Sequence, residues 1–218
     1  IEPVMQISCR DRNKIALQSD ILGANALGIK NILCITGDSV KAGDQQNTKA
    51  VHEFESVKLL KQIQSFNNGI DPTFELLSDK KTEIFAGAAA DPSYKNLKVL
   101  KMRTERKKEA GAGFIQTQMI MDKKYLINFC DEISKPLNLP VLAGVFFLKS
   151  YKNALFINKN VPGANIPENI LKRLKGSDNP IEEGINIAAE QLREFIDISQ
   201  GVHLMAVKTE HLIPEILK

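Results

Sequence analysis

The stretch "NILCITGDS", residues 31–39, decides how the whole chain is interpreted. Its apolar run, 32–35, has the length and the β-branched content of a buried strand. The run stops at Thr-Gly-Asp, so a carboxylate, Asp38, directly follows the strand. In one interpretation Gly-Asp forms a turn, and Asp38 caps the next loop or helix. In the other, Asp38 is a functional carboxylate at the carboxyl end of a parallel strand.

The same pattern, an apolar run followed by a segment of helical period, recurs along the chain. The predicted strands are 4–9, 31–38, 83–90, 113–121, 140–147 and 201–207. The predicted helices are 14–28, 54–66, 96–111, 123–133, 150–160, 179–199 and 210–218. In the first helix, Asn13 is the expected N-cap and Gly28 the expected stop.

Six consecutive strand–helix units without hairpin signals predict an α/β fold with a parallel sheet buried on both faces. Such strands form either an open doubly wound sheet or a closed TIM (β/α)8 barrel. No Gly-x-Gly-x-x-Gly follows any predicted strand, which weakens the open dinucleotide-binding alternative. The polar loop 39–54 is long enough to be functional.

Size and composition predict one enzyme-like domain over residues 1–218. The net charge of +3, from 29 basic and 26 acidic residues, gives no reason to expect binding to nucleic acid or to an anionic membrane. The three cysteines lie far apart without Cys-x-x-Cys spacing, which argues against a disulfide framework and a structural zinc site. With no signal peptide and no apolar run of bilayer length, we expect a reducing, cytoplasmic setting. Because no initiator Met is present, we expect a fragment of a longer protein.

Other polar side chains also lie at or near predicted strand ends. Gln116 and Gln118 interrupt an apolar strand and should point to the same side of it. A buried primary amide that lacks partners costs about 1–3 kcal/mol, so each is either a ligand contact or satisfied structurally. We expect the basic helix 98–109 to be mainly a solvated outer face from which one side chain can reach a phosphate, and His203 to be structural rather than a ligand. No Ser-His-Asp set and no cluster of metal ligands is evident, so no metal is expected.

Several segments, in order, resemble the methylenetetrahydrofolate reductases. The most specific are "SCRDRN" (8–13) and "LQSDILGANALGIKNILCITGD" (17–38). Further matches are "KKEAGAGFIQTQMIMD" (107–122), "PVLAGVFFLKSYKNALF" (140–156), "NVPGANIPENIL" (160–171) and "GVHLMAV" (201–207). The resemblance therefore covers nearly the whole chain.

The resemblance implies a TIM barrel that carries FAD. NAD(P)H passes a hydride to the flavin, which then reduces methylenetetrahydrofolate to the methyl form in a ping-pong cycle. Asp38 resembles the family's catalytic Asp, which lies close to flavin and pterin and stabilises the cationic iminium form of the substrate. Gln118 and Asn153 resemble substrate-binding residues. By the same resemblance, the positions that contact the cofactor are Gln6, Thr36, Gly37, Asp38, His52, Asp91 and Lys107, the last suited to the FAD phosphates.

The departures from the family pattern keep alternatives open. The family's first two strands, with their general-acid Glu, are absent here, so six units should leave an incomplete barrel with open edges. Gln6 replaces a His, Lys208 is a weak stand-in for a substrate-contacting Arg, and "FAGAAADPSY" (85–94) matches the adenine-seating segment only loosely. We therefore expect flavin binding to differ from the family pattern.

The carrier is tetrahydrofolate or tetrahydromethanopterin, and the electron donor is NAD(P)H or a partner redox subunit. A pterin-binding methyltransferase and a non-catalytic folate-binding or scaffold subunit also remain open. We expect a homo-oligomer.

Overall fold

The computed structural model describes residues 2–71, 81–161 and 163–218. Its strands form a sheet in chain order, β1-β2-β3-β4-β5-β6. The strand bounds are Val4–Ser8 (β1), Asn31–Ile35 (β2), Phe85–Ala90 (β3), Phe114–Met119 (β4), Val141–Phe146 (β5) and Gly201–Met205 (β6). The register is parallel for β1–β2, β2–β3 and β5–β6. The α/β fold with its parallel strands is confirmed, whereas closure by further strands stays a prediction.

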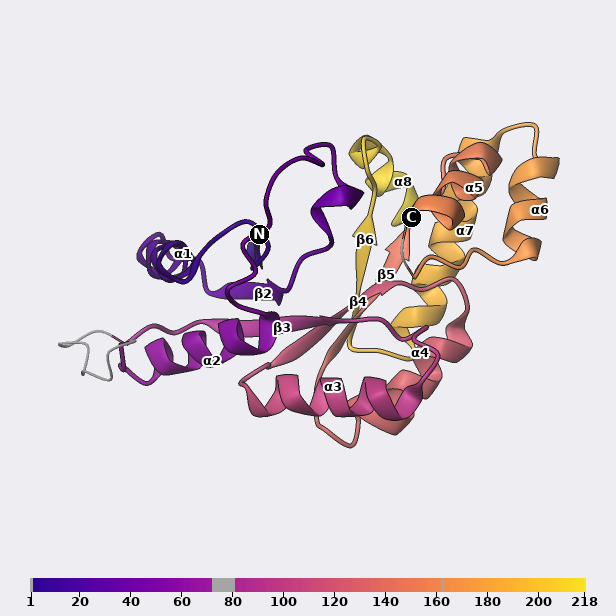
Figure 1. Ribbon diagram of the computed structural model, residues 1–218. Helices are drawn as coiled ribbons and strands as arrows, with labels where there is room; N and C mark the ends of the chain where they lie inside the picture. The colour runs from indigo at the N-terminus through magenta and orange to yellow at the C-terminus, as the bar shows by residue number, and fades with distance from the viewer. Residues whose placement is uncertain (1, 72–80, 162) are drawn as a thin grey trace. The chain divides into compact units, whose positions relative to one another are not determined.

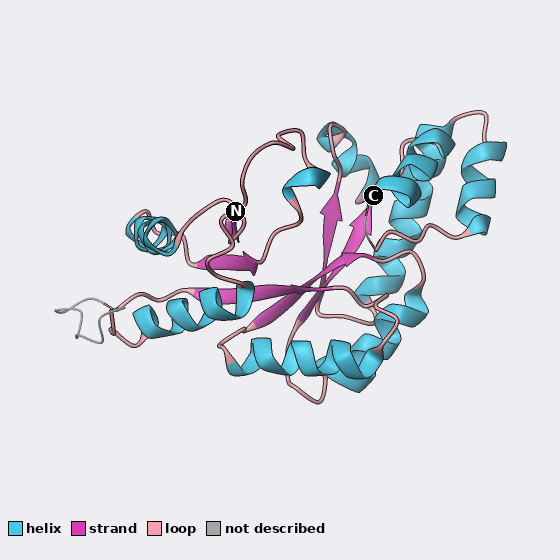
Figure 2. Ribbon diagram, in the orientation of Figure 1, coloured by secondary structure: helices cyan, strands magenta, loops and turns pink. Residues whose placement is uncertain are grey.

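Helices follow the strands along the chain, as Figures 1 and 2 show. Their bounds are Lys14–Ala26 (α1), Ser56–Asn67 (α2), Leu97–Glu109 (α3), Lys123–Phe129 (α4), Tyr151–Asn160 (α5), Glu168–Gly176 (α6), Pro180–Ile196 (α7) and Ile213–Ile216 (α8). Helix α4 continues into one π-helical turn, Cys130–Ser134. Helix α6 was not predicted as a separate element. No helix in the described part of the chain is long and apolar enough to cross a membrane.

The described chain divides into two compact units. Unit 1 comprises Ile1–Ala89 with Met102–Ile115, and unit 2 comprises Ala90–Lys101 with Gln116–Lys218. In each unit the helices bury apolar side chains against the strands, which is the layered arrangement that an α/β fold requires.

Local signals set the ends of α1 in unit 1. The Asn13 side chain accepts from Ala16 N–H at 2.9 Å, which confirms the predicted N-cap. At the other end Gly28 has φ +81°. The bonds Ile29 N–H to the Ala24 carbonyl and Gly28 N–H to the Asn25 carbonyl (2.9 and 3.0 Å) form a Schellman motif. The helix therefore begins and stops where the sequence predicted.

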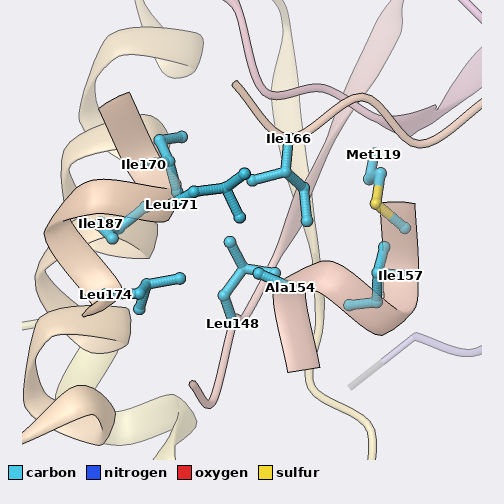
Figure 3. Close-up of a cluster of buried hydrophobic side chains, with 9 residues drawn as sticks. All are labelled: Met119, Leu148, Ala154, Ile157, Ile166, Ile170, Leu171, Leu174 and Ile187. Atoms are coloured by element: carbon cyan, nitrogen blue, oxygen red, sulfur yellow. The ribbon is translucent and has the colours of Figure 1, made fainter. Parts of the chain in front are cut away.

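One hydrophobic cluster of unit 2 lies where α5, α6 and α7 meet the strand ends (Figure 3). Leu148, after β5, and Met119, on β4, pack with apolar side chains from these helices. The other members of this cluster are Ala154, Ile157, Ile166, Ile170, Leu171, Leu174 and Ile187. Helix α7 approaches especially closely, because a Cβ on its Gly184 would lie 2.0 Å from the Leu148 carbonyl oxygen.

Candidate active site

In unit 1 the ends of β1 and β2 carry a small group of charged residues. The Arg10 guanidinium forms a bidentate ion pair with Asp11. Its Nε donates to Oδ1 at 2.7 Å and its Nη2 to Oδ2 at 3.0 Å. These hydrogen bonds, and also the charge of Asp38, raise the pKa of the guanidinium. Asp38 is exposed, and its carboxylate has no hydrogen bond or ion pair with any other described residue. Asp38 is therefore a carboxylate without a direct partner. It interacts through its charge with Arg10, whose guanidinium is held by Asp11.

The interpretation of Asp38 as a cap is wrong. Ser39, not Asp38, is the N-cap of the short 3-10 turn Val40–Ala42, and its side chain accepts from Lys41 N–H at 3.4 Å. Glu55 occupies the N-cap position of α2. No capping role is left to explain a carboxylate at position 38.

The turn that presents Asp38 is built by the two residues before it. The Thr36 hydroxyl accepts from Ser56 N–H at 3.2 Å and so ties the end of β2 to the start of α2. Gly37 has φ +91°, and a Cβ there would lie 2.4 Å from Ser8 Oγ and 2.7 Å from Arg10 Cβ. Both residues thus have a structural role in this turn. Their contact with a cofactor stays a prediction.

Lys107 points inward from an otherwise solvated basic helix. Its ammonium donates to the Ala89 carbonyl, at the end of β3, at 2.6 Å. Burial lowers the pKa of Lys107, and the charge of Arg103 lowers it further. The remaining basic residues of α3 are exposed, which confirms the predicted outer face: Lys98, Lys101, Arg103, Arg106 and Lys108. Since an ammonium has three donors, Lys107 keeps donors for an anion.

The other two cofactor candidates in unit 1 lie at the surface. Gln6 is exposed on β1, and its side chain forms no hydrogen bond with another described residue. His52 is also exposed, has φ +44°, and contributes to the lowered pKa of Asp11, of which Arg10 is the main cause. Nothing among the described contacts joins either side chain to Asp38, so both assignments stay predictions.

In unit 2 Asp91 lines an open pocket of about 700 Å³. Asp91 Oδ1 accepts from Ser93 N–H at 2.9 Å and from Ser93 Oγ at 2.6 Å, which fixes the carboxylate. Tyr94 and Tyr125 contribute aromatic walls. Gly163, with φ +81°, lies so close that a Cβ would be 2.8 Å from Asp91 Oδ2. Asp91 thus belongs to a pocket with both aromatic and polar walls.

The two predicted strand glutamines differ in role. His203 Nε2 lies 3.0 Å from the Thr117 carbonyl oxygen and must carry a proton to donate to it, so Nδ1 accepts from Gln116 Nε2 at 3.4 Å. The structural interpretation is therefore confirmed for Gln116 and His203. Gln118 is half-buried, and its Oε1 accepts from Met119 N–H at 2.9 Å.

Asn153 forms hydrogen bonds with nearby residues at the start of α5. Its N–H donates to the hydroxyl of Ser150, the N-cap of α5, at 3.2 Å. Its Oδ1 accepts from Lys149 N–H at 3.2 Å. The side-chain oxygen is thus engaged at the start of the helix, and substrate binding by Asn153 stays a prediction.

The His203 contacts predict a pH dependence of stability. Burial lowers the pKa of His203 below its usual value, so the folded protein binds fewer protons than the unfolded chain as pH falls through 6.5. The free energy of unfolding should therefore decrease as pH is lowered from 7 towards 5. The variant His203→Gln should show a shallower slope in urea unfolding at several pH values. An unchanged slope would contradict the assignment.

The family model for methylenetetrahydrofolate reductase matches residues 1–218. The chain belongs to the methylenetetrahydrofolate reductase family. It is 26% identical to the Caenorhabditis elegans "Probable methylenetetrahydrofolate reductase (NADPH)" over 100% of this chain and 32% of that protein. It is 26% identical to methylenetetrahydrofolate reductase 2 of Saccharomyces cerevisiae over 94% and 34%. The chain thus spans about a third of the length of these reductases.

Among solved structures, an uncharacterised protein from Clostridium thermocellum, which binds two copies of 5-methyl-5,6,7,8-tetrahydrofolic acid, matches with a TM-score of 0.49. It is 12% identical, over 98% of this chain and 92% of that one. These values mark a loose likeness of fold.

Some site residues were not found from the sequence. Arg10 was recognised only as part of a motif, yet the charge of Asp38 contributes to the raised pKa of its guanidinium. Tyr94 and Tyr125 were not identified as pocket walls. Thr117 was covered only by the matched segment 107–122, without a role of its own. Each of these residues also meets a group from a distant part of the sequence, and no local pattern shows these contacts: Asp38 for Arg10, Gly163 for the two tyrosines and Gly144 for Thr117.

Proposed function

We propose that the whole protein reduces methylenetetrahydrofolate to methyltetrahydrofolate, with NAD(P)H as electron donor. The observation that carries the proposal is the family match over residues 1–218. Two features of the described residues support it, namely the unpaired Asp38 carboxylate at the end of β2 and the inward Lys107 ammonium at the end of β3. FAD, when bound, supplies the hydride-transfer chemistry between the two substrates.

In this proposal Asp38 acts on the carrier substrate. A fixed negative charge next to the pterin stabilises the cationic iminium form that accepts hydride. The two hydrogen bonds to Asp11 hold the Arg10 guanidinium and so restrain its approach to Asp38. Asp38 therefore remains available to the substrate rather than being consumed in an ion pair.

Each unit, taken by itself, offers groups that suit one part of a dinucleotide cofactor. In unit 1 Lys107 combines partial burial with unused donors, which suits a phosphate oxygen. In unit 2 the pocket at Asp91 offers aromatic walls and a fixed carboxylate, which suits a ring system and hydroxyl groups. Gln6, Thr36, Gly37 and His52 complete the proposed cofactor contacts.

Replacement of Lys107 should weaken flavin binding. Lys107→Met removes a partly buried charge-assisted donor, and we expect the dissociation constant of FAD to rise at least about tenfold. The matched control is Lys108→Met, which removes an exposed ammonium from the neighbouring position. Fluorescence titration of the apoprotein measures both. Equal affinity in the two variants would contradict a role for Lys107.

The proposed function is tested by a visible spectrum of the purified full-length protein, followed by anaerobic addition of NADPH or NADH. The name of the worm relative favours NADPH as the first donor to try. A flavin band that bleaches, and that returns when methylenetetrahydrofolate is added, is the expected result. A flavin band that stays would indicate a partner redox protein as donor. Absence of flavin would favour a non-catalytic subunit, and oxidation only by the methanopterin carrier would identify that substrate instead.

A further inference from the structure

Strand β4, which lies between β3 and β5 in the sheet, carries additional side-chain hydrogen bonds at Thr117 and Gln118. Ile120 N–H donates to the Gly144 carbonyl at 2.9 Å. A regular parallel ladder would then also join Gly144 N–H to the Gln118 carbonyl. At this position Gly144 N–H donates to the Thr117 hydroxyl at 2.9 Å, and this hydroxyl donates to the Gln118 carbonyl at 2.8 Å. The threonine hydroxyl is thus inserted between two backbone groups of neighbouring strands.

Two further backbone groups beside Gln118 are also bound by side chains. The Thr117 carbonyl accepts from His203 Nε2 at 3.0 Å. Met119 N–H donates to Gln118 Oε1 at 2.9 Å. The peptide groups on both sides of Gln118 therefore have side-chain partners.

This arrangement fixes the polarity of the Gln118 carboxamide. A backbone N–H can only donate, so the end of the amide that faces Met119 N–H must be the oxygen. The NH2 group has no hydrogen-bond partner among the described residues. A ligand at Gln118 therefore meets donors and no free amide oxygen. Asn153, whose oxygen is held by Lys149 N–H, has the same polarity.

We propose that Thr117 is a positioning residue which, together with His203, holds the Gln118 carboxamide so that its NH2 group donates to an acceptor atom of the ligand. The ligand class is a heterocycle that presents a carbonyl oxygen or an unprotonated ring nitrogen. The proposal rests on the proposed function, in which Gln118 contacts the carrier substrate. It adds the direction of the hydrogen bond and the residues that impose it.

The test uses the flavin-loaded full-length protein and methyltetrahydrofolate as the probe, with binding measured by calorimetry at pH 8. Gln118→Glu keeps an oxygen for Met119 N–H but loses the donor, and we expect affinity to fall at least about tenfold, as for a lost hydrogen bond. Thr117→Val, which lacks the hydroxyl, should weaken binding by about tenfold at unchanged flavin content. Thr117→Ser, which keeps it, should bind within about twofold of the wild type. Undiminished affinity in Gln118→Glu or in Thr117→Val overturns the proposal.

A double-mutant cycle separates positioning from a general structural effect. In the Gln118→Leu background, Thr117→Val should cause no further loss of affinity, because Thr117 acts through Gln118. Additive losses would overturn the proposal.

Failure of the proposed function would be seen separately, as a wild-type protein that does not bind the probe. Hydrogen exchange then decides the positioning claim. Faster exchange of segments 116–121 and 142–146 in Thr117→Val than in Thr117→Ser upholds it, and equal exchange overturns it.

Discussion

Asp38→Asn should slow reduction of the folate carrier by about 100- to 1000-fold, the range found when one group that stabilises transition-state charge is removed. The amide is nearly the same size but carries no charge, so it cannot stabilise a cationic substrate. Asp38 is exposed and forms no hydrogen bond with another described residue, so the fold and the flavin content should not change. Stopped-flow absorbance measures the two half-reactions separately. Reduction of the flavin by NADPH should change far less than its reoxidation by methylenetetrahydrofolate.

Asp44→Asn is the matched control for this variant. Asp44 is an exposed carboxylate of the same loop, and its loss should leave both half-reactions at wild-type rates. Equal slowing of both half-reactions in Asp38→Asn would refute the role assigned to its charge and would instead favour a role in holding the cofactor.

Gly184→Ala should cause the largest loss of stability, about 3 kcal/mol, which is at the upper end for overpacking of a core. The added Cβ would lie 2.0 Å from the Leu148 carbonyl oxygen and 3.1 Å from Phe147 Cε2. The first of these atoms belongs to the backbone, so α7 must move away from the end of β5 rather than a side chain turning aside. Urea unfolding measures the change as a lower midpoint.

Gly176→Ala provides the comparison in the same unit. Gly176 is exposed at the end of α6, and a Cβ there has no atom within 4 Å. Its replacement should raise stability slightly, by about 0.5 kcal/mol, because alanine has less backbone freedom to lose on folding. A Gly184→Ala protein within about 0.5 kcal/mol of the wild type would show that α7 does not depend on this close approach.

The glycine in α7 illustrates what sequence patterns leave out. In a helical pattern, an isolated glycine is read as a weak helix former. Only the approach of a backbone 36 residues earlier in the chain, at Leu148, gives Gly184 its packing role. Helix α6 was missed for a related reason. It is nine residues long, and its apolar positions acquire meaning only in the cluster they share with α5 and α7.

The sequence by itself determined those features that depend on neighbours along the chain. The alternation of strands and helices, the Asn13 cap, the Gly28 stop and the delivery of Asp38 at a strand end all follow from residues a few positions apart. Their energies come from local hydrogen bonds and backbone preferences, which a short segment carries with it.

Tertiary structure decided the rest. The charge of Asp38 acts on Arg10 across 28 positions of the chain, and the hydrogen bond from His203 to the Thr117 carbonyl joins residues that are 86 positions apart. Such contacts exist only after the strands have aligned, because burial and register, rather than residue type, set the distance and the polarity of each hydrogen bond.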